Sequence, residues 1–216
     1  YLILYLLATF LLSTSSLQQE KDSNITPLQA LRAEYKPKMP NSILGGVKLV
    51  EGAATQSVRD QAEIKKMFPK TYGMPIITFE KSNLNGAKTP INVGVMLSGG
   101  QAPVVHNVIS GLYDGLKAIH KDSKLYGFKG GSSGLVGHDY IELTGDIIDQ
   151  YRNTGGFDII GSGRTKLEET EQFDKGLEIC KKLGIKAIVI IGGDDSNTNA
   201  CVLAEYYLSK KAGVQV

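Results

Sequence analysis

The stretch KAIVIIGGDDSNTNA, residues 186–200, decides the fold of this chain. Its first part, Lys186–Ile191, is an almost unbroken apolar run, which predicts a strand buried on both faces of a sheet. Gly192-Gly193 predicts a tight turn, and apolar residues at helical spacing predict a helix from Asn197 to about Lys210. A buried strand, a glycine turn and a helix in this order predict one unit of a parallel α/β sheet.

The same order of elements recurs earlier in the chain. Further strands are expected at Asn92–Leu97, Lys124–Phe128 and Phe157–Ile160, and helices at 105–119, 146–151 and 173–183, the last ended by Gly184. The repetition predicts an α/β fold, a doubly wound, mostly parallel sheet with helices on both faces. Val214–Val216 resemble the first residues of another strand, so we expect a sheet truncated at the C-terminus.

The residues before the sheet predict two further regions. Residues 1–24 read as an apolar and then polar N-terminal extension, disordered or artefactual, with a targeting segment or a packed helix as alternatives. Residues 25–90 read as a helical and loop region. A capping box at Thr26-Pro27-Leu28-Gln29 predicts one helix, a second is expected from Ser57 to Phe68, and 71–90 reads as loop-rich. Residues 91–216 form the predicted α/β domain.

Composition excludes several classes of function. Among 216 residues, 24 Lys and Arg face 22 Asp and Glu, and a net charge of +2 gives no basic field for nucleic acid. No apolar run is long enough to predict a membrane span. The two cysteines, Cys180 and Cys201, predict buried thiols in a reducing compartment. Glycine is the anomaly, because 25 of 216 residues, nearly 12%, exceed the ordinary share of about 7%.

The glycines predict where the chemistry lies. Three glycine-rich loops, Ser98–Pro103, Gly161–Arg164 and Gly192–Thr198, follow predicted strands, and ligands of open α/β sheets bind beyond the carboxyl ends of the strands. Each loop precedes a helix, whose N-terminus attracts an anion such as phosphate. The plainer interpretation, that glycine pairs only make tight turns, stays open for any one loop.

Two side-chain groups sharpen this prediction. Adjacent carboxylates at Asp194-Asp195 repel each other and lose solvation at the end of a buried strand, which suggests a bound cation such as Mg²⁺. Arg164 is placed to neutralise a phosphoryl group in transfer. A capping aspartate with a solvated neighbour, and a surface arginine, are the alternatives.

Together these segments resemble the pyrophosphate-dependent phosphofructokinases of the long, plant-like and spirochaete-like type. The resemblance covers roughly residues 26–216, and it rests on LSGGQAP (97–103), HNVISGL (106–112), LYGFKGG (125–131), YRNTGGFDI (151–159), SGRTKLE (162–168) and IGGDDSNTNA (191–200). It implies reversible, Mg²⁺-dependent phosphoryl transfer from pyrophosphate to the 1-hydroxyl of fructose 6-phosphate. It also implies a cytoplasmic homo- or hetero-oligomer of phosphofructokinase subunits acting in glycolysis and gluconeogenesis, with no nucleic acid or membrane as partner.

The resemblance also assigns roles to residues. Gly99 and Gly100 match the loop that contacts the phosphoryl donor, and Arg164 matches the arginine that stabilises the transferring phosphate. Asp194 matches the aspartate associated with magnesium. Asp195 stands where ATP-using relatives carry glycine, so its carboxylate is expected to repel the α-phosphate of ATP and favour pyrophosphate. The resemblance adds Ser196 and Asn197 to the phosphate-binding residues.

This chain departs from the family pattern in two ways. Val104-Val105 replaces a Gly-Gly pair, and because valine is bulky and is taken to forbid positive φ, we expect donor binding to be weakened or abolished. The aspartate that acts as general base lies in a motif expected beyond Val216, so this chain alone is expected to be inactive. The alternatives are a non-catalytic or regulatory subunit or fragment of the same enzyme, an ATP-dependent 6-phosphofructokinase, and a doubly wound nucleotide-binding signalling module.

Overall fold

The computed structural model describes residues 26–41, 46–82 and 89–216, and the chain divides after Pro37 into two units. The first unit contains helix α2 (Pro27–Glu34), and its predicted capping box is confirmed. The Gln29 amide donates to the Thr26 hydroxyl at 3.2 Å, and the Thr26 amide donates to the Gln29 side chain at 2.8 Å. The predicted extension over residues 1–24 lies outside the described residues.

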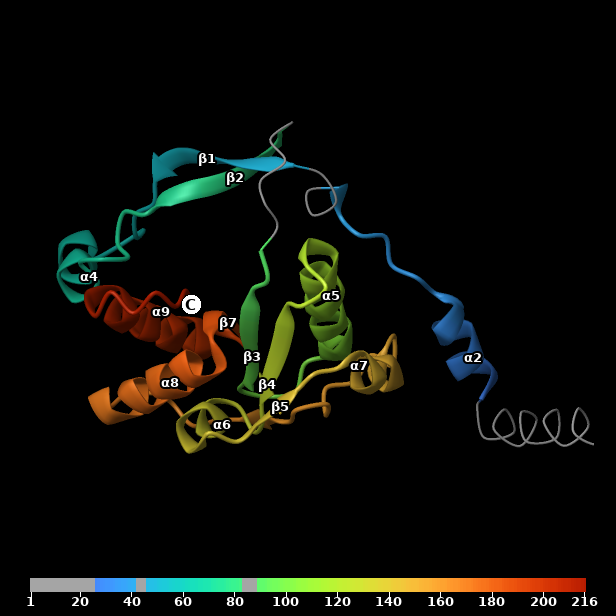
Figure 1. The fold of residues 1–216 in the computed structure, drawn as a ribbon. Coiled ribbons are helices and arrows are strands. Elements are labelled where there is room, and N and C mark those ends of the chain that lie inside the picture. The colour runs from blue at the N-terminus through green and yellow to red at the C-terminus, as the bar shows by residue number, and fades with distance from the viewer. Residues whose placement is uncertain (1–25, 42–45, 83–88) are drawn as a thin grey trace, which may run out of the picture. The chain divides into compact units, whose positions relative to one another are not determined.

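The second unit is built around strand β3 (Asn92–Ser98), which lies at the centre of a five-stranded sheet (Figure 1). β3 runs parallel to β4 (Lys124–Phe128), β6 (Ser162–Gly163) and β7 (Ile185–Ile191), and β5 (Tyr140–Glu142) is antiparallel to β4. Leu97 is paired with Ile191 in β7 and with Ser162 in β6. β6 and β7 therefore lie on opposite sides of the last residues of β3.

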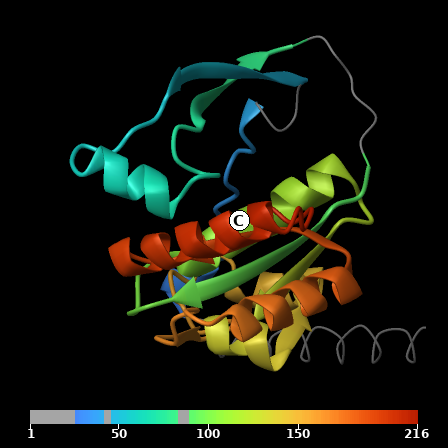
Figure 2. The same ribbon diagram turned by 90° about the vertical axis from the view of Figure 1, so that its left-hand side faces the viewer.

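Helices cover both faces of this sheet. Val93, Val95 and Leu97 of β3 point toward α5 (Val105–Ile119) and α7 (Gly145–Tyr151), where they join one buried apolar cluster. The alternate residue Met96 joins a second cluster with α6 (Ser132–Gly137), α8 (Thr170–Leu183) and α9 (Asp194–Ser209). Figure 2 looks onto the face that α8 and α9 cover. The predicted doubly wound, mostly parallel fold is confirmed.

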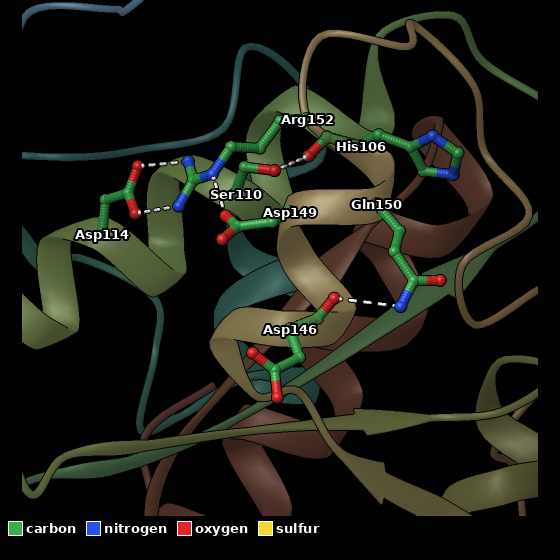
Figure 3. A network of polar contacts seen from close by, with 7 residues as sticks. All are labelled: His106, Ser110, Asp114, Asp146, Asp149, Gln150 and Arg152. Carbon is green, nitrogen blue, oxygen red and sulfur yellow. Dashed lines mark hydrogen bonds and ion pairs between the residues drawn. The ribbon is translucent and has the colours of Figure 1, made fainter. Parts of the chain in front are cut away.

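An ion-pair network joins α5 to the end of α7 (Figure 3). The Arg152 guanidinium donates to both carboxylate oxygens of Asp114 at 2.7 Å and to Asp149 at 2.6 Å. The hydrogen bonds to Asp114, more than any other contact, raise the pKa of Arg152. A planar, bidentate pair of this kind fixes direction as well as distance. It therefore fixes the point where the chain leaves α7 toward the loop before β6.

Several sequence predictions were wrong in detail. Phe157–Ile160 is not a strand, and the chain pairs with β3 only afterwards, at β6. No strand was predicted in the loop-rich region 71–90, but β2 (Pro75–Lys81) lies there and forms an antiparallel hairpin with β1 (Val47–Ala54). The helix expected at 57–68 is shorter, α4 (Gln61–Met67), and α6 was not predicted.

The start of α9 differs from the sequence prediction, and its later residues contact other parts of the chain. α9 begins at Asp194, three residues before the predicted start. Near its other end, the Glu205 carboxylate accepts the Lys70 and Thr71 amides at 2.8 and 2.9 Å. After α9, Gln215 forms an isolated parallel bridge with Ala187, where the sequence predicted the first residues of another strand. Among the described residues, none of the helices has the length and apolar character needed to cross a membrane.

Candidate functional site

The structure brings the three glycine-rich loops together at the carboxyl ends of β3, β6 and β7. The Gly99 amide donates to the Gly163 carbonyl at 2.9 Å, and the Ser162 hydroxyl donates to the Gly99 carbonyl at 2.8 Å. From the other side, the Ser196 hydroxyl donates to the Ser98 hydroxyl at 2.9 Å. These bonds connect the end of β3 and the residue after it with β6 on one side and with the first turn of α9 on the other.

The junction between β7 and α9 depends on the absence of a side chain at residue 192. A Cβ atom on Gly192 would lie 2.6 Å from the Ser98 carbonyl oxygen, and it would also overlap the Ser196 side chain. At Gly193, by contrast, a Cβ atom would meet nothing within 4 Å. Glycine at position 192 therefore allows α9 to begin directly against β3, and this places its first turn at the site.

The first turn of α9 carries Asp194 and Asp195, and its N-cap residue Gly193 offers no side chain to the free backbone amides. These amides and the helix dipole give the turn a partial positive charge. Both carboxylates are exposed, and 90% of the Asp195 side chain is open to solvent. The expected loss of carboxylate solvation was therefore wrong for this chain, and it gives no reason for a cation.

A cavity of about 140 Å³ opens over this turn. The residues that line it are Ser98, Gly99, Arg164, Lys166, Asp195, Ser196 and Asn199. Of the predicted site residues, Gly99, Arg164, Asp195 and Ser196 line the cavity. Gly100, Asp194 and Asn197 do not, although a Cβ atom on Gly100 would lie 3.7 Å from the Arg164 guanidinium. The structure thus brings together most, but not all, of the predicted residues.

Sequence reasoning missed two of the residues that line the cavity, Lys166 and Asn199. The Asn199 amide oxygen accepts the Leu167 N–H at 3.0 Å, and its amide nitrogen donates to the Leu167 carbonyl. Lys166 places its ammonium 4.0 Å from the Asp195 carboxylate. A basic residue two positions after Arg164 was a signal for Lys166. No local pattern signals a side-chain bond to backbone 32 residues away.

The turn at Val104 corrects a sequence expectation. Valine does not forbid the conformation that glycine would adopt there, because Val104 has φ 62° and ψ 14°, in the left-handed region. Its N–H donates to the Gly155 carbonyl at 3.0 Å, while Val105 is buried as the first residue of α5. The left-handed region is costly for a β-branched residue. The backbone thus keeps the turn under strain, and Val104 is not among the residues of the cavity.

A buried histidine anchors the loop that leads to Arg164. The Ile159 N–H donates to Nε2 of His106 at 3.1 Å, so Nδ1 carries the proton and donates to the Thr154 hydroxyl at 2.7 Å. Burial lowers the pKa of His106, and Asp158, with a carboxylate oxygen 3.2 Å from Nε2, opposes this shift. The neutral ring therefore acts here as a structural link.

A second, larger cavity of about 330 Å³ has no charged side chain in its wall. It is lined by Thr55, Gln56, Ser57, Ile64, Phe68, Thr71, Tyr72, Gly73, Thr198 and Cys201. Uncharged walls give no counter-charge for a phosphate. Cys201 is only half-buried there, contrary to the expectation of two buried thiols, whereas burial raises the pKa of Cys180 to about 12. The smaller cavity is therefore the candidate anion site.

Few side chains of the described residues are placed to bind a metal ion together. No group of three or more His, Cys, Asp or Glu side chains gathers in residues 26–41, 46–82 and 89–216. The Asp194 carboxylate is exposed at the first turn of α9 and makes no side-chain hydrogen bond or ion pair within these ranges. One carboxylate together with phosphate oxygens is a common set of ligands for Mg²⁺. The chemistry of the Asp194 carboxylate fits this set, although Asp194 is not among the residues that line the cavity.

Comparison with known proteins gives a consistent result. Residues 92–214 match the family model described as phosphofructokinase. A pyrophosphate–fructose 6-phosphate 1-phosphotransferase from Porphyromonas gingivalis is 59% identical over 88% of this chain and 34% of its own length. The protein of that name from Entamoeba histolytica is 45% identical over 85% of this chain and 34% of its length. Subunit beta 1 from Arabidopsis thaliana is 45% identical over 88% and 34%. The chain thus spans about a third of these relatives.

Proposed function

Because this chain belongs to the phosphofructokinase family, we propose that it forms the phosphoryl-donor side of a pyrophosphate-dependent 6-phosphofructokinase. The reaction is the reversible transfer of a phosphoryl group from pyrophosphate to the 1-hydroxyl of fructose 6-phosphate, giving fructose 1,6-bisphosphate. The names of the similar proteins support this reaction. Since the chain spans about a third of their length, we assign it the donor site alone.

The observation that carries the proposal is the cavity between Arg164 and the first turn of α9. The free backbone amides in this turn are suited to bind phosphate oxygens. Arg164, which lies over Gly100, is suited to stabilise the charge on the phosphoryl group in transfer. Such fixed donors lower the barrier because they need no reorganisation during the reaction.

Asp195 sets the choice of donor in this proposal. Its carboxylate lines the cavity, and an α-phosphate placed against it would meet both its volume and its negative charge. Inorganic pyrophosphate has no third phosphate and no nucleoside, so it avoids this contact. The proposed enzyme therefore uses pyrophosphate in preference to ATP, and the presence of Asp195 argues against the ATP-dependent alternative.

Two further parts of the proposal concern the metal and the assembly. A divalent cation, Mg²⁺ by its preference for oxygen ligands, would be held by Asp194 and the donor phosphates, where it would neutralise phosphate charge. We also propose an oligomer in the cytoplasm. The subunit name of the Arabidopsis relative supports assembly with other chains.

The test is a donor assay on the complete polypeptide that carries these residues, with pyrophosphate and ATP compared at equal Mg²⁺. The unaltered protein should use pyrophosphate, and Asp195→Gly should lower that activity and admit some ATP. Asp195→Asn keeps the volume without the charge and separates the two effects. Glu178→Gln, an exposed carboxylate on α8, is the matched control. An unchanged donor preference in Asp195→Gly would refute the assigned role of Asp195, and absence of transfer from pyrophosphate in the unaltered protein would refute the function.

A further inference from the structure

The side chains given a role in the donor cavity so far, Arg164 and Asp195, carry no net positive charge for an anionic ligand. Pyrophosphate is a small, multiply charged anion, and the cavity that would hold it includes the Asp195 carboxylate. Arg164 supplies one positive charge, which Asp195 alone would cancel. Lys166 is the other cation in the wall of the cavity. Its position relative to Asp195 is the basis of the inference.

The contact between Lys166 and Asp195 contributes little to the stability of the fold as an ion pair. The two charged groups are 4.0 Å apart, and their side chains are 56% and 90% exposed. Exposed pairs of this kind contribute little to folding, because water screens them and two flexible side chains must be ordered. The lysine ammonium is thus solvated and accessible from the cavity, where an anion can replace its water.

The backbone beneath Lys166 is nevertheless held firmly. The next residue, Leu167, is 1% exposed, and both of its backbone polar groups bond to the Asn199 side chain. Asn199 lies four residues after Asp195 on α9, so the two side chains share one face of the helix. Asn199 therefore attaches the loop to the same helical face from which Asp195 projects, and this brings Lys166 over the first turn.

We propose that Lys166 is a donor-binding residue, whose ammonium offsets the Asp195 carboxylate and contacts the phosphate of an inorganic diphosphate. This inference rests on the proposed function and names a residue for its donor specificity. With Lys166, the side chains that line the cavity carry a net positive charge. Without it, Arg164 and Asp195 cancel. The lysine thus allows the carboxylate that repels ATP to stand beside an anionic donor.

The experiment is calorimetric titration of this chain with pyrophosphate, and with methylenediphosphonate as a diphosphate that is not hydrolysed, in Mg²⁺ buffer at several salt concentrations. Lys166→Met should weaken binding about tenfold to a hundredfold, the range for loss of a charge-assisted contact, and should lessen the salt dependence. Lys166→Arg should stay within a few-fold of the unaltered chain. Lys182→Met, which removes an exposed lysine from the last turn of α8, is the control and should bind as the unaltered chain does.

The outcomes separate this inference from the function on which it rests. If the unaltered chain binds the diphosphates and Lys166→Met binds them equally well, the role of Lys166 is refuted while the donor site stands. If the unaltered chain binds neither, the donor site and the inference fail together. Thermal unfolding of each variant shows whether a loss of binding reflects a loss of fold.

A second variant tests the offsetting of Asp195 directly. If Lys166 neutralises that carboxylate, then adding Asp195→Asn to Lys166→Met should recover at least several-fold of the lost affinity. The gain from Asp195→Asn should be larger in Lys166→Met than in the unaltered chain, so the two substitutions should be non-additive, as expected for charges that interact. Strictly additive effects on binding would overturn the pairing of Lys166 with Asp195.

Discussion

The strained turn at Val104 gives a prediction whose sign can be derived from the backbone. Val104 has φ 62°, its side chain is 54% exposed, and its carbonyl accepts the Val108 amide at the start of α5. An L-residue in the left-handed region costs about 1–2 kcal/mol, whereas glycine pays about 0.5–1 kcal/mol of extra chain entropy. Val104→Gly should therefore be more stable than Val104→Ala by about 0.5–1 kcal/mol.

Comparing the two variants with each other isolates the cost of a Cβ atom at this turn, because both lack the two γ-methyl groups and they differ only in the alanine methyl group. The assay is urea denaturation followed by far-UV circular dichroism, with the free energy of unfolding extrapolated to water. The expected difference corresponds to about 1–4 °C in the melting temperature. The control is Val108, a helical residue on α5 that is also partly exposed, where glycine should be less stable than alanine by about 1 kcal/mol.

The reasoning is refuted if Val104→Ala equals or exceeds Val104→Gly in stability, because the left-handed conformation would then carry no cost. It is also refuted if both positions favour the same residue. Opposite signs at the two positions, four residues apart, would locate the strain at the turn itself. If Val104→Gly also strengthens binding of pyrophosphate, the valine pair limits the donor site, as the sequence suggests.

Three further predictions concern positions around the site. Asn199→Leu leaves the buried Leu167 amide and carbonyl without partners, so urea denaturation should show a free energy of unfolding lower by about 1–3 kcal/mol. Unchanged stability would show that the Asn199 side chain does not hold this loop. In thermal unfolding, Gly192→Ala should lower the stability by about 1–3 kcal/mol, because the new methyl group overlaps its neighbours. Gly193→Ala places its methyl group in open space and should lower the stability by less than about 1 kcal/mol. Equal losses would contradict the close packing at Gly192. Burial lowers the pKa of His106 below 6.5, so the unfolded chain binds more protons and stability should fall as pH decreases below that value; His106→Gln should flatten this part of the denaturation profile.

The sequence predicted those elements whose residues carry a strong periodic signal. β3, β4 and β7 are apolar runs, and α5 and α8 repeat apolar residues at helical spacing, so burial and pattern agree. The β1–β2 hairpin was missed because most of its residues are exposed, and its apolar side chains therefore follow no simple alternation. In α6, Ser-Ser-Gly reads as a turn, but Leu135 is fully buried and packs against the sheet.

The error at Phe157–Ile160 has a specific cause. These residues are apolar enough to suggest a strand, but Ile160 fills the space that a side chain on Gly127 would occupy. Its apolar character serves packing over β4 rather than pairing in the sheet. The pairing falls instead on Ser162–Gly163, where a side chain on Gly163 would overlap the Gly130 carbonyl. Only the tertiary structure shows that these two residues, with small or no side chains, can pair with β3.

The candidate site was predictable to the extent that its residues follow strands directly. Gly99, Arg164 and Asp195 each lie within a few residues of a strand end, and the topology brings them together. Lys166 and Asn199 depend on a contact between a loop and a helix face, which has no local signature. The start of α9 also changed the electrostatics, since aspartates in a first turn complement the helix dipole.

The central place of β3 has a consequence for the order in which this chain can fold. On one side β3 pairs with β4, where Asn92 is the partner of Lys124. On its other side β3 pairs with β7, which comes much later in the chain, and there Asn92 is the partner of Ile185. Closing the longer loop costs more chain entropy and slows folding. During synthesis from the N-terminus, one edge of β3 is therefore open to pairing with another chain until residues 185–191 emerge. The cavity over the first turn of α9 is complete only when β7 has docked.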